Sequence, residues 1–286
     1  MIAHVAAASE SRGRVVLRFC AGSPSRAAIG AAFKVAEAFQ SEVESLYIEN
    51  RELIDLANYS FAVEISLTGR RRHLSQGLLH SEFLSVFSAA RRQIKSIADR
   101  SGVPLQEHYV RDEPVHALAA ACARSGPWNV VALAEAFSAE SVSALREMFD
   151  SVPDTTGAIL AGPHACQRSG PIIVAVEDLD RFPSMLRAAE RLAALMDSFI
   201  AILPVASTSR ELMKLDGEIR LALADRSDAL IAASAATAGE AAVVAELIRR
   251  LRGSFLIARF GGHSVPDHGS LRPLTAVLEC PLFLVR

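Results

Sequence analysis

Short apolar runs alternate with amphipathic segments along most of the chain. In its first part, runs of strand length occupy residues 14–19, 43–48, 105–110, 128–133 and 157–161. Between these runs, apolar residues recur every three or four positions, which is the spacing of one helix face. Strands joined by helices in this way form right-handed β–α–β units with parallel strands. The first part of the chain is therefore predicted to be one α/β unit.

Capping residues mark the helix boundaries in this part. Ser23 is predicted to cap the first helix, with Pro24 at its first helical position. The second helix has an apolar stripe that starts at Phe83, and Gly102 is predicted to end it. Shorter helices are predicted at 115–124 and near 139–149.

A second series of elements follows a linker at 162–171 that is rich in glycine and proline. The pattern predicts strands at 172–176, 199–205, 218–223, 254–258 and 281–285, and helices at 185–196, 239–251 and 271–278. Residues 225–238 match no single pattern. Because the opening order of elements repeats, we interpret the chain as two diverged copies of one fold. The second copy is predicted to lack the second helix and the long connection (49–76) of the first.

The predicted fold class is α/β, with two tandem five-stranded parallel-sheet units of which the second is shortened. The predicted domains are residues 1–163 and 170–286. A chain of 286 residues exceeds the usual size of one domain. Its 51 % hydrophobic residues, of which few are aromatic, suit helices packed on parallel strands that are buried on both faces.

Charge and cysteine content exclude several classes of protein. A net charge of −2 argues against nucleic acid as an obligatory partner, since binding a polyanion needs a basic surface. No stretch approaches the roughly 18 apolar residues of a membrane helix, and residues 1–14 do not match a signal peptide. The four cysteines form no C-x-x-C pair and predict neither a disulfide framework nor a zinc site. A protein of the reducing cytoplasm is expected.

Two short motifs carry a family resemblance. The closing Cys280-Pro281 pair and the apolar run after it resemble the last strand of universal stress proteins. The opening run, residues 15–24, resembles their first strand and its turn. The resemblance extends over nearly the whole chain as a tandem pair. It implies the adenine nucleotide α-hydrolase-like type of parallel sheet, and ATP or AMP as the ligand of many members.

In that family, phosphates lie against a glycine-rich loop after the fourth strand, where open N–H groups and a helix dipole favour an anion. An acidic residue at the end of the first strand accompanies this loop. In the first unit Ala21 stands at the acidic position, and residues 134–138 contain no glycine. A polyphosphate would meet Glu135 there, so we expect no ATP binding of the family's kind in the first unit.

The second unit keeps more of the pattern. The resemblance places Glu177 (or its neighbour Asp178) at the acidic position, and Gly262, Gly269 and Ser270 in the loop and at the start of the last helix. Residues 263–268, between the two glycines, are fewer than the family motif has, and Pro266 removes one N–H donor. Either a residual nucleotide site or an ordinary loop with a helix cap explains these residues.

Other chemistry finds little support in the sequence. His263, Asp267 and His268 supply metal-ligand types but no recognised ligand spacing, so no metal site is predicted. No Gly-x-Ser-x-Gly elbow, dinucleotide fingerprint or P-loop is present, and no catalytic residue is assigned. The basic run 70–73 is expected to be a solvated loop rather than an anion site.

The connection 49–76 admits three interpretations: a flap over the sheet edge, a docking surface, or a structural lid. We therefore expect a non-enzymatic protein of the universal stress type that acts through stress-related ligand sensing or through protein partners. The alternative is a module that binds ATP or AMP in the second unit alone. By the same resemblance, strand 157–161 should pair with strand 281–285 to give an intrachain pseudo-dimer, and a homodimer stays open.

Overall fold

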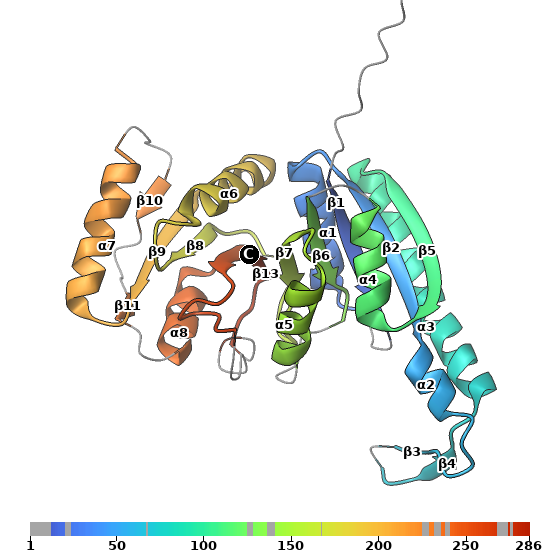
Figure 1. The fold of residues 1–286 in the computed structure, drawn as a ribbon. Helices are drawn as coiled ribbons and strands as arrows, with labels where there is room; N and C mark the ends of the chain where they lie inside the picture. The colour runs from blue at the N-terminus through green and yellow to red at the C-terminus, as the bar shows by residue number, and fades with distance from the viewer. Residues whose placement is uncertain are drawn as a thin grey trace, which may run out of the picture.

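The computed structural model describes eleven separate stretches of the chain. They are residues 13–20, 24–66, 68–124, 128–135, 141–166, 168–224, 229–231, 236–237, 241–267, 274 and 277–286. In these stretches helices lie on both faces of one large sheet, so the predicted α/β class is confirmed (Figure 1).

We call the elements from β1 to β7 the first half and those from β8 to β13 the second half. The first half contains β1 (Arg14–Phe19), α1 (Arg26–Ala38), β2 (Glu42–Asn50), α2 (Arg51–Leu56), β3 (Val63–Ile65), β4 (Arg71–His73), α3 (Gln76–Ser101), β5 (Leu105–Asp112), α4 (Pro114–Ala123), β6 (Asn129–Leu133), α5 (Ser141–Ser151) and β7 (Thr155–Leu160). The second half contains β8 (Ile172–Val176), α6 (Phe182–Met196), β9 (Ile200–Ala206), α7 (Ser209–Ala222), β10 (Ala229–Ile231), β11 (Ala236–Thr237), α8 (Ala241–Leu251), β12 (Phe255–Arg259) and β13 (Leu282–Val285).

The main sheet has the strand order β10-β9-β8-β12-β13-β7-β6-β1-β2-β5, and β11 also pairs with β9. Every described pair in this sheet is parallel except β13 with β7. If β3, β4 and β11 are set aside, each half has five strands. Read outward from the centre of the sheet, they follow the order β7-β6-β1-β2-β5 in the first half and β13-β12-β8-β9-β10 in the second. Counted along the chain, both halves therefore have the order fifth, fourth, first, second, third. The two halves thus share one topology and meet at β7 and β13.

The antiparallel pair of β7 and β13, which we call the seam, is the pairing predicted for strands 157–161 and 281–285. Phe283 lies opposite Ile159, and Val285 lies opposite Gly157. A Cβ atom on Gly157 would lie 2.5 Å from the carbonyl oxygen of Leu284, so only glycine lets the two backbones approach this closely. The prediction that these strands pair is confirmed.

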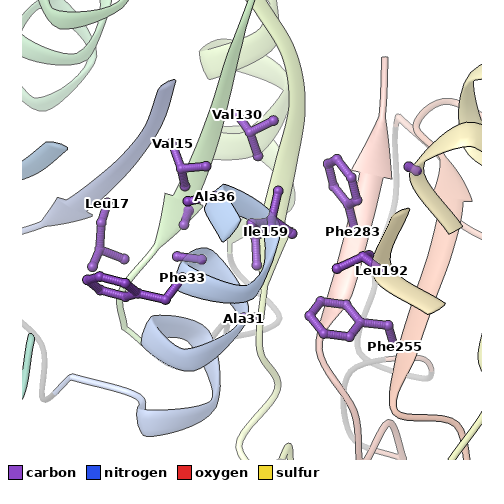
Figure 2. Packing of buried hydrophobic residues seen from close by; sticks show 14 of the residues in the cluster. Val15, Leu17, Ala31, Phe33, Ala36, Val130, Ile159, Leu192, Phe255 and Phe283 are labelled. Atoms are coloured by element: carbon purple, nitrogen blue, oxygen red, sulfur yellow. The ribbon is translucent and has the colours of Figure 1, made fainter. Parts of the chain in front are cut away.

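The hydrophobic core is split into two layers by the sheet. One layer packs α1, α3, α6 and α7 on one face, and the other packs α4, α5 and α8 on the opposite face. Alternate strand residues supply the two layers, as a strand that is covered on both sides requires. In Figure 2, Ala36 of α1 lies next to Val15 and the ring of Phe33 extends toward Leu17, while Phe255 and Phe283 belong to strands of the second half. Each layer is continuous across the seam.

The connection 49–76 is more ordered than a loop. Helix α2 leads into the two-stranded antiparallel hairpin of β3 and β4, which projects from the body of the molecule beside the start of α3 (Figure 1). The basic run 70–73, expected as a solvated loop, therefore mostly forms β4, although its side chains are exposed. Arg72 pairs with Glu64 on β3 and with Glu82 on α3, which ties the hairpin to that helix.

Several other predictions need correction. Ser25, whose Oγ accepts the N–H of Ala28, caps α1 in place of the predicted Ser23. The strand predicted at 218–223 is wrong, because these residues belong to the end of α7. Thr208 and Glu211 form a capping box that starts this helix ten residues earlier. Since α7 lies between β9 and β10 as α3 lies between β2 and β5, the second half has not lost its second helix.

Several expectations fall on residues outside the described stretches. They concern Ala21, residues 136–138, His268, most of the helix at 271–278, and the site residues Gly269 and Ser270. Within the described residues, no helix combines the length and the apolar character needed to cross a bilayer.

Candidate functional site

The expected ligand site lies where β8 and β12 end, next to each other in the sheet. Glu177 directly follows β8, and Gly262 lies three residues beyond the end of β12. Open α/β sheets usually bind ligands beyond the carboxyl ends of such strands. The structure therefore brings together two of the four predicted site residues.

The carboxylate of Glu177 fills this place itself. Its two oxygens accept the backbone N–H groups of His263, at 2.5 Å, and Ser264, at 2.6 Å. Hydrogen bonds from backbone N–H groups to a carboxylate are charge-assisted and are about twice as strong as neutral ones. The donors that would face a phosphate are thus already bound to an anion of the chain.

Gly262 makes this contact possible. A Cβ atom built on this residue would overlap Oε2 of Glu177, so any other residue would displace the carboxylate or the loop. The loop is closed further by the N–H of Gly261, which donates to the carbonyl of Val265 at 2.9 Å, and Val265 is fully buried. The predicted glycine is needed for close approach, but what approaches it is a side chain.

The neighbouring acid, Asp178, has a different role. It pairs with Arg259 at the end of β12, and its other oxygen accepts the N–H of Asp180 at 2.9 Å. Of the two acidic residues that the sequence left open for this position, Glu177 is therefore the one that contacts the loop.

The first half has a related contact with the two strands exchanged. Glu135 follows β6, and its Oε1 accepts the backbone N–H of Cys20 just after β1, at 2.5 Å. Arg18 on β1 lies 3.9 Å from the other carboxylate oxygen. In each half, then, a glutamate that follows one strand accepts backbone N–H groups of the loop that follows the neighbouring strand. In the second half the glutamate follows β8 and the loop follows β12, and in the first half the glutamate follows β6 and the loop follows β1.

Three of the four cysteine thiols, those of Cys20, Cys122 and Cys280, are not activated nucleophiles. Burial raises the pKa of Cys20 to about 11, with the Glu135 charge adding to the rise and Arg18 opposing it. Burial likewise raises the pKa of Cys122 and of Cys280 to about 12. A thiol becomes a good nucleophile when its pKa is lowered, so these three are protonated at neutral pH and unsuited to attack.

Histidine and carboxylate side chains form no metal centre in the described residues. His263 is exposed, and its backbone N–H rather than its ring contacts Glu177. His268 lies outside the described stretches. The candidate set of His263, Asp267 and His268 therefore receives no support from the part of the chain that the structure describes.

One charged cluster escaped the sequence analysis. Glu44 on β2 has a fully buried side chain that pairs with Arg14 at the start of β1 and with Arg124 after α4, the latter at 2.7 Å. Its position among the apolar residues of a strand is the only signal that the sequence offers. Since the cluster lies at the opposite ends of β1 and β2 from Cys20, we assign it to stability.

Comparisons with known proteins agree with the fold. No family model matches the sequence, and no curated protein matches it either. A universal stress protein from Archaeoglobus fulgidus is a structural match with a TM-score of 0.58 and 10% identity, covering 95% of this chain and 96% of that one. The cytoplasmic domain of a prokaryotic cation chloride cotransporter matches with a TM-score of 0.55 and 12% identity, over 96% and 95% of the two chains.

A functionally unknown protein from Pseudomonas aeruginosa PAO1 is also similar, with a TM-score of 0.54 and 12% identity over 96% of this chain and 93% of that one. The fold is thus of the universal stress protein type, as the resemblance implied. At these identities the likeness concerns the fold alone.

Proposed function

We propose that this chain is a non-enzymatic protein of the universal stress type whose ligand loops are closed by its own carboxylates. Glu177 carries this proposal, because it holds the N–H groups of both His263 and Ser264. A nucleotide would have to displace a negative group that is already hydrogen-bonded there. The raised pKa values of Cys20, Cys122 and Cys280 argue against these three thiols as nucleophiles, which agrees with the proposal.

We also infer that the chain is a tandem duplication, with units at 1–163 and 170–286, that forms a pseudo-dimer within one polypeptide. The shared strand order of the two halves and their antiparallel seam support this inference. Because the seam covers the last strand of each half, that edge is closed to strand pairing with a second copy.

Action through a protein partner is supported by the projecting segment, which we call the arm: α2, β3, β4 and the first turns of α3. It carries most of the exposed large apolar side chains of the described residues: Leu56, Tyr59, Phe61, Val63, Ile65, Leu78 and Leu84. Phe61, the most exposed of them at 71%, stacks on Tyr59 with 5.2 Å between ring centroids. Apolar groups gathered on one projection are typical of interaction surfaces.

Hydrogen exchange of the loop tests the main proposal. In the full-length protein, ATP with Mg²⁺ should leave the exchange of residues 261–265 unchanged, and no phosphate should be released from ATP. In a Glu177→Ala variant the N–H groups of His263 and Ser264 should exchange faster, which shows that the measurement detects the contact. Protection of this loop by ATP in the wild-type protein would overturn the proposal.

The second candidate is ATP or AMP binding in the second half alone, and Gly262 favours it. Once Glu177 swings away, the loop presents two N–H groups beside a residue without a side chain. This candidate requires ATP to protect residues 261–265 and a Gly262→Glu variant to abolish that protection. Protection that persists in Gly262→Glu would exclude it.

A further inference from the structure

A groove of about 740 Å³ lies along the seam, away from the residues that the sequence analysis placed in a ligand site. Its walls come from both halves: Trp128 and Thr156 from the first, and Arg187, Phe283 and Val285 from the second. The groove thus combines the amino ends of β6 and β7 with the carboxyl end of β13. Its volume is in the range of about 300–1,000 Å³ that is usual for small-molecule sites.

The charged side chains that line this groove are all positive. Arg187 and Arg191 project from α6, Arg181 precedes that helix as its N-cap residue, and Arg286 follows β13. No described aspartate or glutamate side chain lines the groove. Among the ion pairs of the described residues, none involves any of these four arginines. Elsewhere on the molecule arginines are commonly paired, as Arg72 and Arg111 are. This groove therefore concentrates positive charge that the chain does not neutralise with its own described side chains.

Some of the guanidinium groups are already held in place. Arg286 donates to the carbonyls of Val152, at 3.4 Å, and Pro153, at 3.2 Å. The guanidinium of Arg191 lies 4.8 Å above the ring of Phe39, which in turn packs against Trp128 with 5.1 Å between ring centroids. Each guanidinium has five N–H donors, so most of these donors stay available to a ligand. Held arginines lose less conformational freedom when they bind an anion.

We propose that this groove binds a small molecule that carries two or more phosphate groups. Planar guanidinium groups match phosphate oxygens in bidentate pairs, and several of them around one cavity favour a multiply charged anion over a single phosphate. Phe39, Trp128 and Phe283 supply an apolar wall for a ring or chain attached to the phosphates. Neither Glu177 nor Gly262 lines the groove, so this proposal goes beyond the proposed function and does not rest on it.

Trp128 provides a direct readout, because it is the only tryptophan of the chain. The full-length protein is titrated with inorganic triphosphate and, separately, with ATP, while tryptophan fluorescence and heat are recorded. We expect saturable binding of both probes that weakens as the salt concentration rises. Arg187→Glu and, separately, Arg181→Glu should each weaken binding at least tenfold. Both side chains are exposed, so both variants should fold.

Arg210→Glu is the matched control, since Arg210 is exposed on α7 outside the groove and the charge changes by the same amount. It should bind as the wild-type protein does. Equal affinity for the two probes would support recognition through phosphates alone, and tighter binding of ATP would support an added contact of the nucleoside with the apolar wall. No binding of either probe, or binding that both groove variants leave unchanged, would overturn the proposal. Exchange in loop 261–265, measured independently, decides the proposed function separately.

Discussion

Gly262 faces the carboxylate of Glu177 so closely that a methyl group on the glycine would overlap Oε2. Gly262→Ala should therefore push the carboxylate away from the N–H groups of His263 and Ser264. A hydrogen bond to a charged acceptor contributes about 1.5–3 kcal/mol. His263 is exposed and its N–H can bond water instead, whereas Ser264 is buried, so we count one lost bond and expect the free energy of unfolding to fall by roughly 2 kcal/mol. Urea unfolding measures this change.

Gly217→Ala is the control for that experiment. Gly217 lies within α7, and nothing lies within 4 Å of a Cβ atom placed on it. Alanine in a helix should stabilise the protein by about 0.5–1 kcal/mol. If both alanine variants had the same effect, the close approach of Glu177 to Gly262 would not be an energetic constraint.

The seam should respond to a single methyl group. In Gly157→Ala the new carbon would lie 2.5 Å from the carbonyl oxygen of Leu284 and 2.8 Å from a ring carbon of Phe283, so β7 and β13 must separate. Overpacking of this kind typically costs about 1–3 kcal/mol. A lower urea midpoint, together with faster hydrogen exchange in both strands, is the expected result. Faster exchange in β7 alone would mean that the strands do not support each other.

The buried carboxylate of Glu44 should contribute more to stability than that of Glu42, which is only partly buried. Glu44→Gln leaves Arg14, whose side chain is 12% exposed, without its buried partner, and we expect a loss of about 3 kcal/mol. Glu42 lies 3.6 Å from Arg14, and its side chain is 27% exposed. Glu42→Gln should lower the free energy of unfolding by at most about 1 kcal/mol. Similar losses for the two variants in chemical denaturation would contradict this ranking.

Stability should decline at alkaline pH because of the buried thiols. Burial raises the pKa of Cys122 and of Cys280 from about 9 to about 12. Above pH 9 the unfolded chain loses these protons while the folded chain keeps them, so the free energy of unfolding falls as the pH rises. The slope is about 1.4 kcal/mol per pH unit for each thiol.

Urea unfolding between pH 8 and 10.5 measures that slope, and a Cys280→Ala variant isolates one thiol. The variant is less stable at every pH because it leaves a cavity, but its slope should be shallower than that of the wild-type protein. Parallel slopes would mean that Cys280 ionises equally in both states.

Most of the sheet could be predicted because its strands are continuous apolar runs, which a strand covered on both faces requires. Residues 218–223 were misassigned because Ile219 and Leu221 alternate like a strand. The helix is set by the distant capping box at Thr208 and by Leu215 and Ile219, which are both buried and lie four residues apart. A window of six residues contains neither signal.

The site could be predicted only in part. The sequence indicated Glu177 and Gly262 as neighbours of a ligand, but the partner of Glu177 is the loop itself, 86 residues away along the chain. Glu135 and Cys20 are separated by 115 residues, and Glu44 and Arg14 by 30. Contacts at such separations follow from strand order, which periodicity does not specify. The groove along the seam also depends on strand order, because its walls come from the two halves, which meet at β7 and β13.

The reversal of direction at the seam also determines how the molecule can be approached. Because β7 and β13 are antiparallel, the strands of the two halves run in opposite directions. Their carboxyl ends therefore lie at opposite ends of the sheet. A molecule that contacts the loop closed by Glu135 and one that contacts the loop closed by Glu177 therefore come from opposite directions. The two loops cannot form one shared site, because they lie at opposite ends of the sheet's strands.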